Sequence, residues 1–534
     1  MIEEAPGAER RGARAFALAT LVAWGLTVGG APLLVGPPGG DDAYYHAMYA
    51  QQHARCWKQG VAFPRWYPDL NGGLGGPEPR ARPVLPLALH AAVAAALDDA
   101  VATISLATLV IPVAAGLAMR AAARRRGAGN WEATVAGAAW AAAPYLLISL
   151  HERTALQECW ALAVLPWAVE ALLPPRPFGG REVARGGLGF AVLLATQLLV
   201  AYTAMAAVAA AHAASWDRRP RAAFGAGLLG AGFAAFSWLP NLVSLRRLQG
   251  EAFAQGWFDW RGRFLFAPDA SDAELARHML LAFVGVCAAG LVVAVSRRHD
   301  TRAVAAVGLV LALLATPLAR PLYQVVPGFA MLQFPWRWLG VATGLVVLAA
   351  ALRVPAPRGV LALALALAPV AGADLFSARL ASGPPLRPSD APAATWTSAT
   401  RFGVPPVLPS FPAALPRGVD LRRALGAASA ARHALPRPGD TGPRRWEWRV
   451  SRSSEGPFVL PLLADDGWRT EVDGGEVAWR AADGLVEVPV PAGTHTIVAR
   501  QVWLVEDWTA AAVSALVVAG ALAWRRRLRA KGDW

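Results

Sequence analysis

Residues 10–35 read RRGARAFALATLVAWGLTVGGAPLLV: a short arginine cluster followed by a largely apolar run from Ala15 to Val35. The run has about the length that crosses the hydrocarbon core of a bilayer. No small-residue cleavage site follows it, so we expect a signal anchor that is retained. The positive charge in front of it predicts that the chain starts on the cytoplasmic side and emerges near Gly36.

The rest of the 534-residue chain continues this pattern. Hydrophobic residues make up 55% of it and charged residues only 16%, whereas soluble domains carry roughly a quarter charged residues. This composition excludes a cytosolic enzyme, a coiled coil and a disordered chain. The net charge of +14 comes largely from arginine clusters between apolar blocks, which are typical of cytoplasmic loops rather than of a nucleic-acid binder.

The apolar blocks predict a polytopic α-helical membrane protein with roughly 12 spans. After the first, they lie at residues 83–97, 100–119, 131–150, 155–173, 187–213, 221–245, 277–296, 302–318, 336–352, 358–376 and 508–524.

Two topologies fit these blocks. In the one that we favour, all arginine-rich links face the cytoplasm, residues 83–97 do not cross, and residues 187–213 form a tight hairpin that turns near Tyr202. In the other, residues 83–97 cross, residues 187–213 are one helix, and the arginines at 124–126 face outside.

Residues 377–507 predict a domain outside the membrane, rich first in Pro and Gly and then in alternating strand-like runs. Two turn signals, Asp473-Gly474-Gly475 and Asp483-Gly484, separate runs typical of short antiparallel strands. We therefore expect a C-terminal extracytoplasmic β-sandwich-like domain. The runs lie at residues 458–463, 468–472, 485–490 and 494–502. Residues 1–376, with an outer loop at 36–99, form the transmembrane domain, and residues 508–534 form the last span and a basic cytoplasmic tail.

Two adjacent carboxylates, Asp41 and Asp42, follow the first predicted span. An aromatic segment comes next, which suits the headgroup level of a membrane. One carboxylate can accept a proton from an attacking hydroxyl as a general base. The alternative is that both aspartates cap the helix that follows, because Asp is favoured at helix N-termini. The residues alone leave both interpretations open.

Several motifs resemble those of the GT-C superfamily of membrane glycosyltransferases, and within it the bacterial membrane family named "6-pyruvoyl-tetrahydropterin synthase-related", close to the YfhO-like proteins. The motifs are Phe63-Pro64-Arg65-Trp66 through Asn71-Gly72-Gly73, His151-Glu152-Arg153 with Glu158 and Pro166, Phe236-Ser237-Trp238-Leu239-Pro240, Gln333-Phe334-Pro335-Trp336-Arg337-Trp338, and Gly467-Trp468 with Val472-Asp473-Gly474. The family name does not describe this chain as a pterin synthase, because its nine histidines are scattered and show no pairing as zinc ligands.

This resemblance implies a GT-C-like fold and places roles on residues. Asp41 or Asp42 would be the catalytic base. Arg153, Arg337 and Arg65 would bind the phosphate of a lipid-linked donor, since a guanidinium group matches phosphate oxygens in a bidentate manner. Lipid-monophosphate donors need no metal, so we expect no cofactor, and a divalent metal is left open.

Supporting roles fall on His46, His151, Glu152, Glu158 and Gln333. His46 lies one helical turn beyond Asp42 and either orients the base or reaches the membrane surface. Arg153 either binds phosphate or pairs with Glu152 or Glu158. Residues 333–338 are either part of the site or an aromatic membrane anchor.

The predicted activity is inverting transfer of a sugar from a polyprenyl-phosphate donor to an envelope glycan, lipid or protein on the outer face of a bacterial cytoplasmic membrane. Relatives often carry a histidine where this chain has Ala201-Tyr202-Thr203, so no catalytic role is assigned there. The alternatives are a transporter or flippase for a lipid-linked glycan, which places charges at mid-depth in broken helices, and a non-catalytic protein of envelope assembly.

Overall fold

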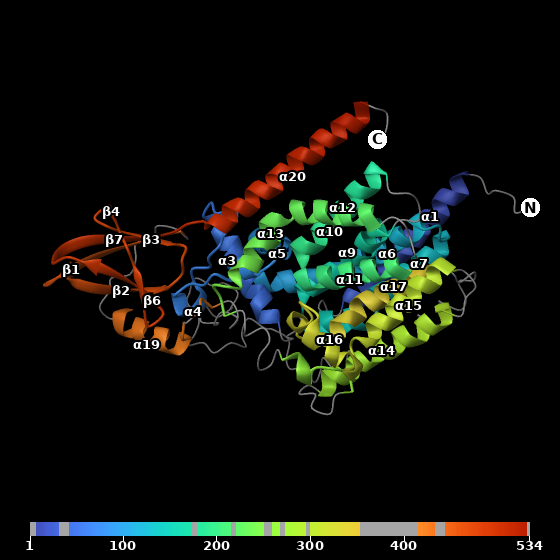
Figure 1. Cartoon of the computed structure of the whole chain (residues 1–534), viewed down its shortest axis with the longest axis horizontal. Coiled ribbons are helices and arrows are strands. Elements are labelled where there is room, and N and C mark those ends of the chain that lie inside the picture. Colours follow the sequence, from blue (N-terminus) through green and yellow to red (C-terminus); the bar gives the residue numbers. More distant parts are fainter. Residues whose placement is uncertain are drawn as a thin grey trace, which may run out of the picture.

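The computed structural model describes residues 7–30, 42–173, 179–214, 220–249, 259–266, 273–294, 299–352, 415–417, 419–432 and 444–530. Most of these residues are helical, and a group of antiparallel strands lies near the C-terminal end of the chain. Figure 1 shows the helices as a bundle with the strands at one end of it. The predicted span at residues 358–376 lies outside the described residues.

The helices are α1 (Gly7–Gly29), α3 (Ala43–Lys58), α4 (Leu70–Gly73), α5 (Val84–Leu97), α6 (Ala100–Arg125), α7 (Asn130–Ala141), α8 (Pro144–Leu147), α9 (Leu156–Leu172), α10 (Gly180–Thr196), α11 (Leu198–Ala214), α12 (Pro220–Phe233), α13 (Ala235–Ser244), α14 (Ala273–Ala294), α15 (His299–Leu313), α16 (Arg320–Val325), α17 (Trp338–Ala351), α19 (Leu421–Arg432) and α20 (Val505–Ala530). A π-helical turn spans Ile148–Glu152, and short 3-10 turns span Glu78–Ala81, Trp260–Gly262, Pro317–Ala319, Ala330–Leu332 and Pro335–Arg337.

The chain is a multi-pass membrane protein by the length and composition of its helices. Four helical segments in the described part are long and apolar enough to cross a bilayer, and three bent pairs raise the number to seven if each pair is one span. The predicted twelve or so spans are therefore not reached among the described residues. Pro144 and Pro317 each begin the second half of a bent pair, because proline lacks the N–H that continues a helix.

The two uncertain blocks also differ from simple spans. Residues 84–97 form α5, whose 14 residues extend about 21 Å, short of the roughly 30 Å of hydrocarbon. Residues 187–213 are divided between α10 and α11 by one extended residue, Gln197, with φ −160° and ψ 115°. The predicted turn near Tyr202 is wrong, since Tyr202 lies inside α11.

The arginine-rich link between α6 and α7 lies beside the start of α1 and the end of α9. The side chain of Asn130, after the α6–α7 link, donates to the carbonyl of Ala13 in α1. Arg126 in that link donates to the carbonyl of Leu173, at the end of α9. These two contacts agree with the favoured topology, in which this link, the start of α1 and the end of α9 share one side of the membrane.

The strands form two antiparallel sheets. One has the order β1-β7-β3-β4 and the other β2-β6-β5. Their bounds are β1 (Arg445–Arg452), β2 (Gly456–Leu463), β3 (Trp468–Val472), β4 (Gly475–Val477), β5 (Arg480–Ala482), β6 (Leu485–Val490) and β7 (Gly493–Gln501). Asp473 and Asp483 have φ of 51° and 49°, and the glycine after each is also at positive φ, which two-residue hairpin turns require. The predicted turns are confirmed.

The loop between α3 and α5 contributes to the core of the strand region. Trp66 and Leu74 are buried in the same hydrophobic cluster as Trp468 and the inward residues of both sheets. The rings of Trp66 and Trp468 meet edge to face, with centroids 5.0 Å apart. The backbone N–H of Leu463 donates to the carbonyl of Leu74 over 3.0 Å. The loop between α3 and α5 and the strand region therefore share one core.

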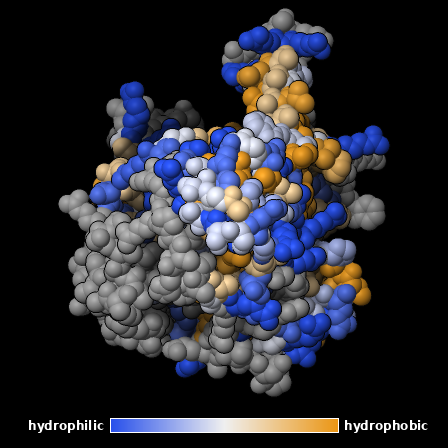
Figure 2. All heavy atoms as spheres, turned by 90° about the vertical axis from the view of Figure 1, so that its left-hand side faces the viewer, coloured by the Kyte–Doolittle hydropathy of each residue, from blue (hydrophilic) through white to orange (hydrophobic). Residues whose placement is uncertain are grey.

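Helix α20 leads from the strand region back along the bundle. Its face away from the bundle is apolar, with Trp508, Leu516 and Leu522 all more than half exposed. Figure 2 shows this helix standing out as an apolar column with a hydrophilic end, where Arg525 and its neighbours lie. An apolar surface of this kind with a basic end is typical of a membrane-spanning helix.

Candidate functional site

One cavity of about 670 Å³ lies where the outer-loop helices meet the bundle. This volume falls in the range of small-molecule sites. Its walls come from the start of α3, the segment before α5, the start of α9, the α10–α11 break, α13 and the segment before α17. The polar and aromatic residues that line it are Asp42, Tyr45, His46, Tyr49, Arg82, Arg153, Gln157, Glu158, Gln197, Tyr202, Trp238, Asn241, Gln333, Phe334 and Arg337.

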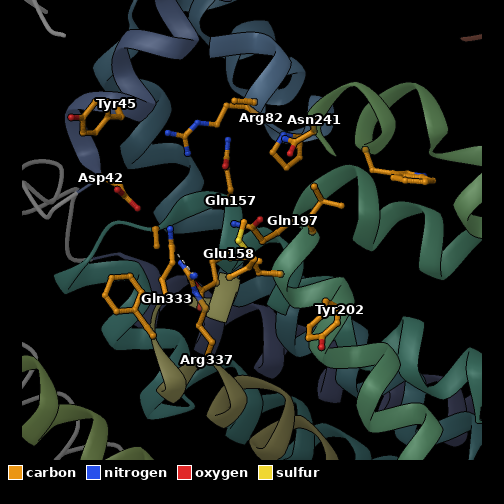
Figure 3. Close-up of a pocket in the computed structure, with 18 of the residues that line it drawn as sticks. Asp42, Tyr45, Arg82, Gln157, Glu158, Gln197, Tyr202, Asn241, Gln333 and Arg337 are labelled. Atoms are coloured by element: carbon orange, nitrogen blue, oxygen red, sulfur yellow. Dashed lines mark hydrogen bonds and ion pairs between the residues drawn. The ribbon is translucent and has the colours of Figure 1, made fainter. Parts of the chain in front are cut away.

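Six residues that the sequence analysis singled out line this cavity together. They come from three separate parts of the chain and are Asp42, His46, Arg153, Glu158, Gln333 and Arg337. Figure 3 shows Asp42 on one side, with Glu158, Gln333 and Arg337 close together on another. Asp41, the other candidate base, lies outside the described residues.

Asp42 occupies the N-cap position of α3, but its side chain makes no capping hydrogen bond. Its backbone N–H donates to the carbonyl of Arg153 over 3.1 Å, which ties the two loops together. Burial raises the pKa of Asp42 above its ordinary value, whereas the guanidinium groups of Arg153, Arg82 and Arg337 lower it. The carboxyl group is thus directed to the cavity rather than to the helix that it precedes.

Two arginines share one buried carboxylate. Nη1 of Arg153 and Nε of Arg337 each lie 3.3 Å from Oε2 of Glu158. The hydroxyl of Tyr145 donates to the other oxygen of the same carboxylate. All four side chains are buried or nearly so, so the two guanidinium groups are held in fixed positions.

The ring of Phe334 lies among three guanidinium groups. The Cζ atoms of Arg337, Arg153 and Arg263 lie 5.1, 5.3 and 5.9 Å from its centroid, within the range of cation–π attraction. The next residue back, Gln333, has a φ of 63° and accepts a hydrogen bond from Nη1 of Arg337 over 2.9 Å. A non-glycine residue in this conformation is strained, and such strain is often found at functional sites.

His46 is held inside the protein. Its Nε2 accepts a hydrogen bond from the backbone N–H of Leu156 over 3.1 Å, and its ring meets that of His90 at 5.7 Å. Burial holds the pKa of His46 well below its ordinary value, with the charges of His90 and Arg82 as smaller causes. The neutral ring therefore joins α3 to the start of α9 and does not reach the membrane surface.

Three of the expected site residues lie outside the cavity. Arg65 is buried in an ion pair, with its Nε 2.9 Å from Oδ1 of Asp507 at the start of α20. Glu152 pairs with Nδ1 of His278 over 2.8 Å. His151 is buried in the π-helical turn before α9. The structure therefore separates Arg65 from the other two expected phosphate ligands.

Sequence reasoning missed several lining residues. Arg82 projects into the cavity opposite Arg337 (Figure 3), and its Nη2 donates to the hydroxyl of Tyr49 over 2.9 Å. Its only sequence signal is its place in the outer loop, directly before the proline that precedes an apolar block. Gln157, Gln197 and Asn241 also line the cavity, and neutral amides inside apolar blocks gave no signal.

The charged groups of the cavity favour an anion. Arg82, Arg153 and Arg337 face the carboxylates of Asp42 and Glu158, so arginines outnumber carboxylates on its walls. In the described part of the chain, no group of three His, Cys, Asp or Glu side chains is arranged to hold a metal ion.

No family model and no curated protein matches this chain. Among solved structures, it is similar to the arabinofuranosyltransferase AftD from Mycobacteria, with 16% identity and a TM-score of 0.45 over 91% of this chain and 40% of that one. Two structures of a mutant of that enzyme have 16% identity and TM-scores of 0.43 and 0.44, covering 92% and 91% of this chain and 42% and 41% of theirs. This chain thus spans about two fifths of the AftD chain.

Proposed function

We propose that the protein is a membrane glycosyltransferase that moves a sugar from a polyprenyl-phosphate donor to a hydroxyl acceptor. The observation that carries this proposal is the convergence of Asp42, Arg153 and Arg337, from distant parts of the chain, on one cavity. A carboxylate that accepts a proton and guanidinium groups that bind a phosphate are the two functions that such a transfer needs.

The apolar part of the cavity suits a lipid chain. Leucine side chains from α11, α13 and α14 and Met331 form this part of its wall. One of them, Leu242 on α13, is 53% exposed, so the cavity wall continues onto the outside of an apolar helix. A polyprenyl chain bound there would remain in contact with the membrane while its phosphate reaches the arginines.

The proposed reaction assigns one step to each of these groups. The acceptor hydroxyl loses its proton to Asp42 as its oxygen bonds to C1 of the sugar, and the bond from C1 to the phosphate oxygen breaks. The phosphate that leaves carries negative charge, which Arg153 and Arg337 stabilise from fixed positions. Attack on the face opposite the phosphate inverts the configuration at C1. Asp41 is a second candidate for the base.

The same proposal covers orientation and location. The strand region and the cavity would face the outside of a bacterial cytoplasmic membrane, and both termini would be cytoplasmic, as the arginine clusters of the sequence favour. The acceptor would be an envelope glycan, lipid or protein. The domain limits would be residues 1–376 for the transmembrane part, 377–507 for the β-rich domain and 508–534 for the last helix and tail.

The test is genetic and chemical. Deleting the protein should remove one sugar from an envelope glycan, seen as a change in mass, and the wild-type chain should restore it. Asp42→Asn should insert normally but fail to restore the sugar, since loss of a general base costs about 10²–10⁴-fold in rate.

The matched control is Asp69→Asn, an outer-loop carboxylate that pairs with Arg55 outside the cavity and should restore the sugar. Full complementation by Asp42→Asn would refute its role as base, and Asp41→Asn distinguishes the neighbouring carboxylate. An unchanged envelope together with accumulation of a lipid-linked glycan on the inner leaflet would instead indicate a flippase.

A further inference from the structure

Three amide side chains line the cavity beside its charged groups. Gln157 lies in the first turn of α9, Gln197 is the single residue between α10 and α11, and Asn241 lies in α13. Figure 3 shows Gln157 between Arg82 and Glu158, with Gln197 and Asn241 farther from Asp42. The amides therefore adjoin the charged groups but carry no charge themselves.

Two of these amides, Gln157 and Asn241, are buried. Gln157 is only 5% exposed, and its Nε2 has no hydrogen-bond partner among the described residues. Asn241 is 8% exposed. A buried amide without a hydrogen bond is unfavourable, so its polar atoms need a partner that enters the cavity.

The backbone at Gln197 supports the same conclusion. Helices α10 and α11 are both apolar, yet they are interrupted for this residue alone. The N–H of Gln197 still donates to Leu193, and its carbonyl still accepts from Ala201. The break therefore leaves the main chain satisfied while it places a polar side chain at the cavity wall.

We infer that Gln157, Gln197 and Asn241 form a subsite for a neutral ring with several hydroxyl groups, that is, a glycosyl unit. Each amide presents both a donor and an acceptor, which matches hydroxyl groups that both give and take hydrogen bonds. A phosphate would be met by arginines, and a prenyl chain by leucines, so neither needs amides. The inference rests on the proposed function, and the glycosyl unit belongs either to the donor or to the acceptor.

The experiment measures binding to the full-length protein in nanodiscs by native mass spectrometry. The probes are decaprenyl phosphate, decaprenyl-phosphoryl mannose and decaprenyl-phosphoryl arabinofuranose, with the free methyl mannoside and methyl arabinofuranoside as further probes. Gln157→Leu and Asn241→Leu should each weaken a sugar-bearing probe by about tenfold, the effect of one or two lost hydrogen bonds. Both should leave decaprenyl phosphate within about twofold.

Two controls separate binding from folding. Gln324→Leu changes an exposed amide on α16 outside the cavity and should alter no binding. The thermal stability of Gln157→Leu should be equal to or above that of the wild type, because the substitution removes an unsatisfied buried group. A merely structural amide would instead lose stability when it is replaced.

The outcomes distinguish the subsite from the transferase. If only the lipid-linked sugars depend on the amides, the subsite holds the donor sugar; if the free glycosides depend on them, it holds the acceptor. If glycosides bind through the amides but decaprenyl phosphate does not bind at all, the subsite stands and the transferase fails. If the amide variants bind every probe as the wild type does, or if neither the lipid-linked sugars nor the free glycosides bind the wild type, the inference is overturned.

Discussion

Replacing Asp507 by asparagine tests how the outer loop is attached to the last helix. Asp507 is 1% exposed and Arg65 is 6% exposed, and their Oδ1 and Nε atoms lie 2.9 Å apart. Arg80 lies near the same carboxylate, at 3.9 Å, but also has Asp465 at 2.8 Å. The variant therefore leaves Arg65 as a buried charge without its counter-ion. Breaking a buried pair in this way costs about 3–5 kcal/mol.

Cys56 offers a direct assay of this cost. It is fully buried, and its Sγ lies 4.0 Å from the carbonyl oxygen of Trp66, so a thiol reagent reaches it only when the loop opens. With Cys159 and Cys287 replaced by alanine, Asp507→Asn should raise the labelling rate of Cys56 by about a hundredfold or more, since each 1.4 kcal/mol corresponds to tenfold.

A control variant and a compensating double variant test whether the labelling rate reports on the buried ion pair. Asp98→Asn removes an exposed partner of Lys58 and should change the rate less than about fivefold. The double variant Arg65→Met with Asp507→Leu should recover most of the protection, because apolar residues of similar volume often replace a buried pair without loss. A labelling rate for Asp507→Asn that equals the wild-type rate would refute the buried pair as a source of stability.

Two further predictions concern the site and the loop. Only the ionised form of Asp42 accepts a proton, and burial raises its pKa. We therefore expect kcat/KM to fall on acidification with a midpoint above the ordinary aspartate pKa of about 3.9, and a profile flat down to pH 4 would contradict this. Gly75→Ala should increase Cys56 labelling strongly, because Gly75 has a φ of +76° and a Cβ there would overlap the ring of Trp66. The control is Gly474→Ala. Gly474 has a φ of +84° but open space around it, so this variant should cost only about 1 kcal/mol of backbone strain.

The sequence predicts the strand region more accurately than the bundle. Strands β3 and β6 have the bounds of the predicted runs at 468–472 and 485–490, because alternating residues and Asp-Gly turns are local signals. Among the described residues the structure has four candidate spans, or seven if each bent pair is one span. Hydropathy did not predict this number, because it does not show where apolar blocks bend. The break at Gln197 has no proline or glycine beside it and depends on packing and on the cavity that it faces.

The charged residues of the site were predictable from the sequence, because charged residues are scarce in this chain. Asp42, Arg153 and Arg337 stand out because charged residues at membrane depth are costly and are therefore often functional. Arg65 gave the same signal, but its partner Asp507 lies far along the chain, and no local pattern reveals such a pair. The amides of Gln157 and Asn241 gave no such signal in the sequence. An uncharged side chain in an apolar block is not distinguished from its neighbours until the cavity is known.

The most direct test of the central claim is a cryo-EM structure of the protein in nanodiscs with decaprenyl phosphate. We expect density for the phosphate within hydrogen-bond distance of Arg153 and Arg337, in the cavity that Asp42 lines, with the lipid chain along the leucines of α11 and α13. Density for the phosphate elsewhere, such as beside the arginines at the end of α6, would contradict the proposed site.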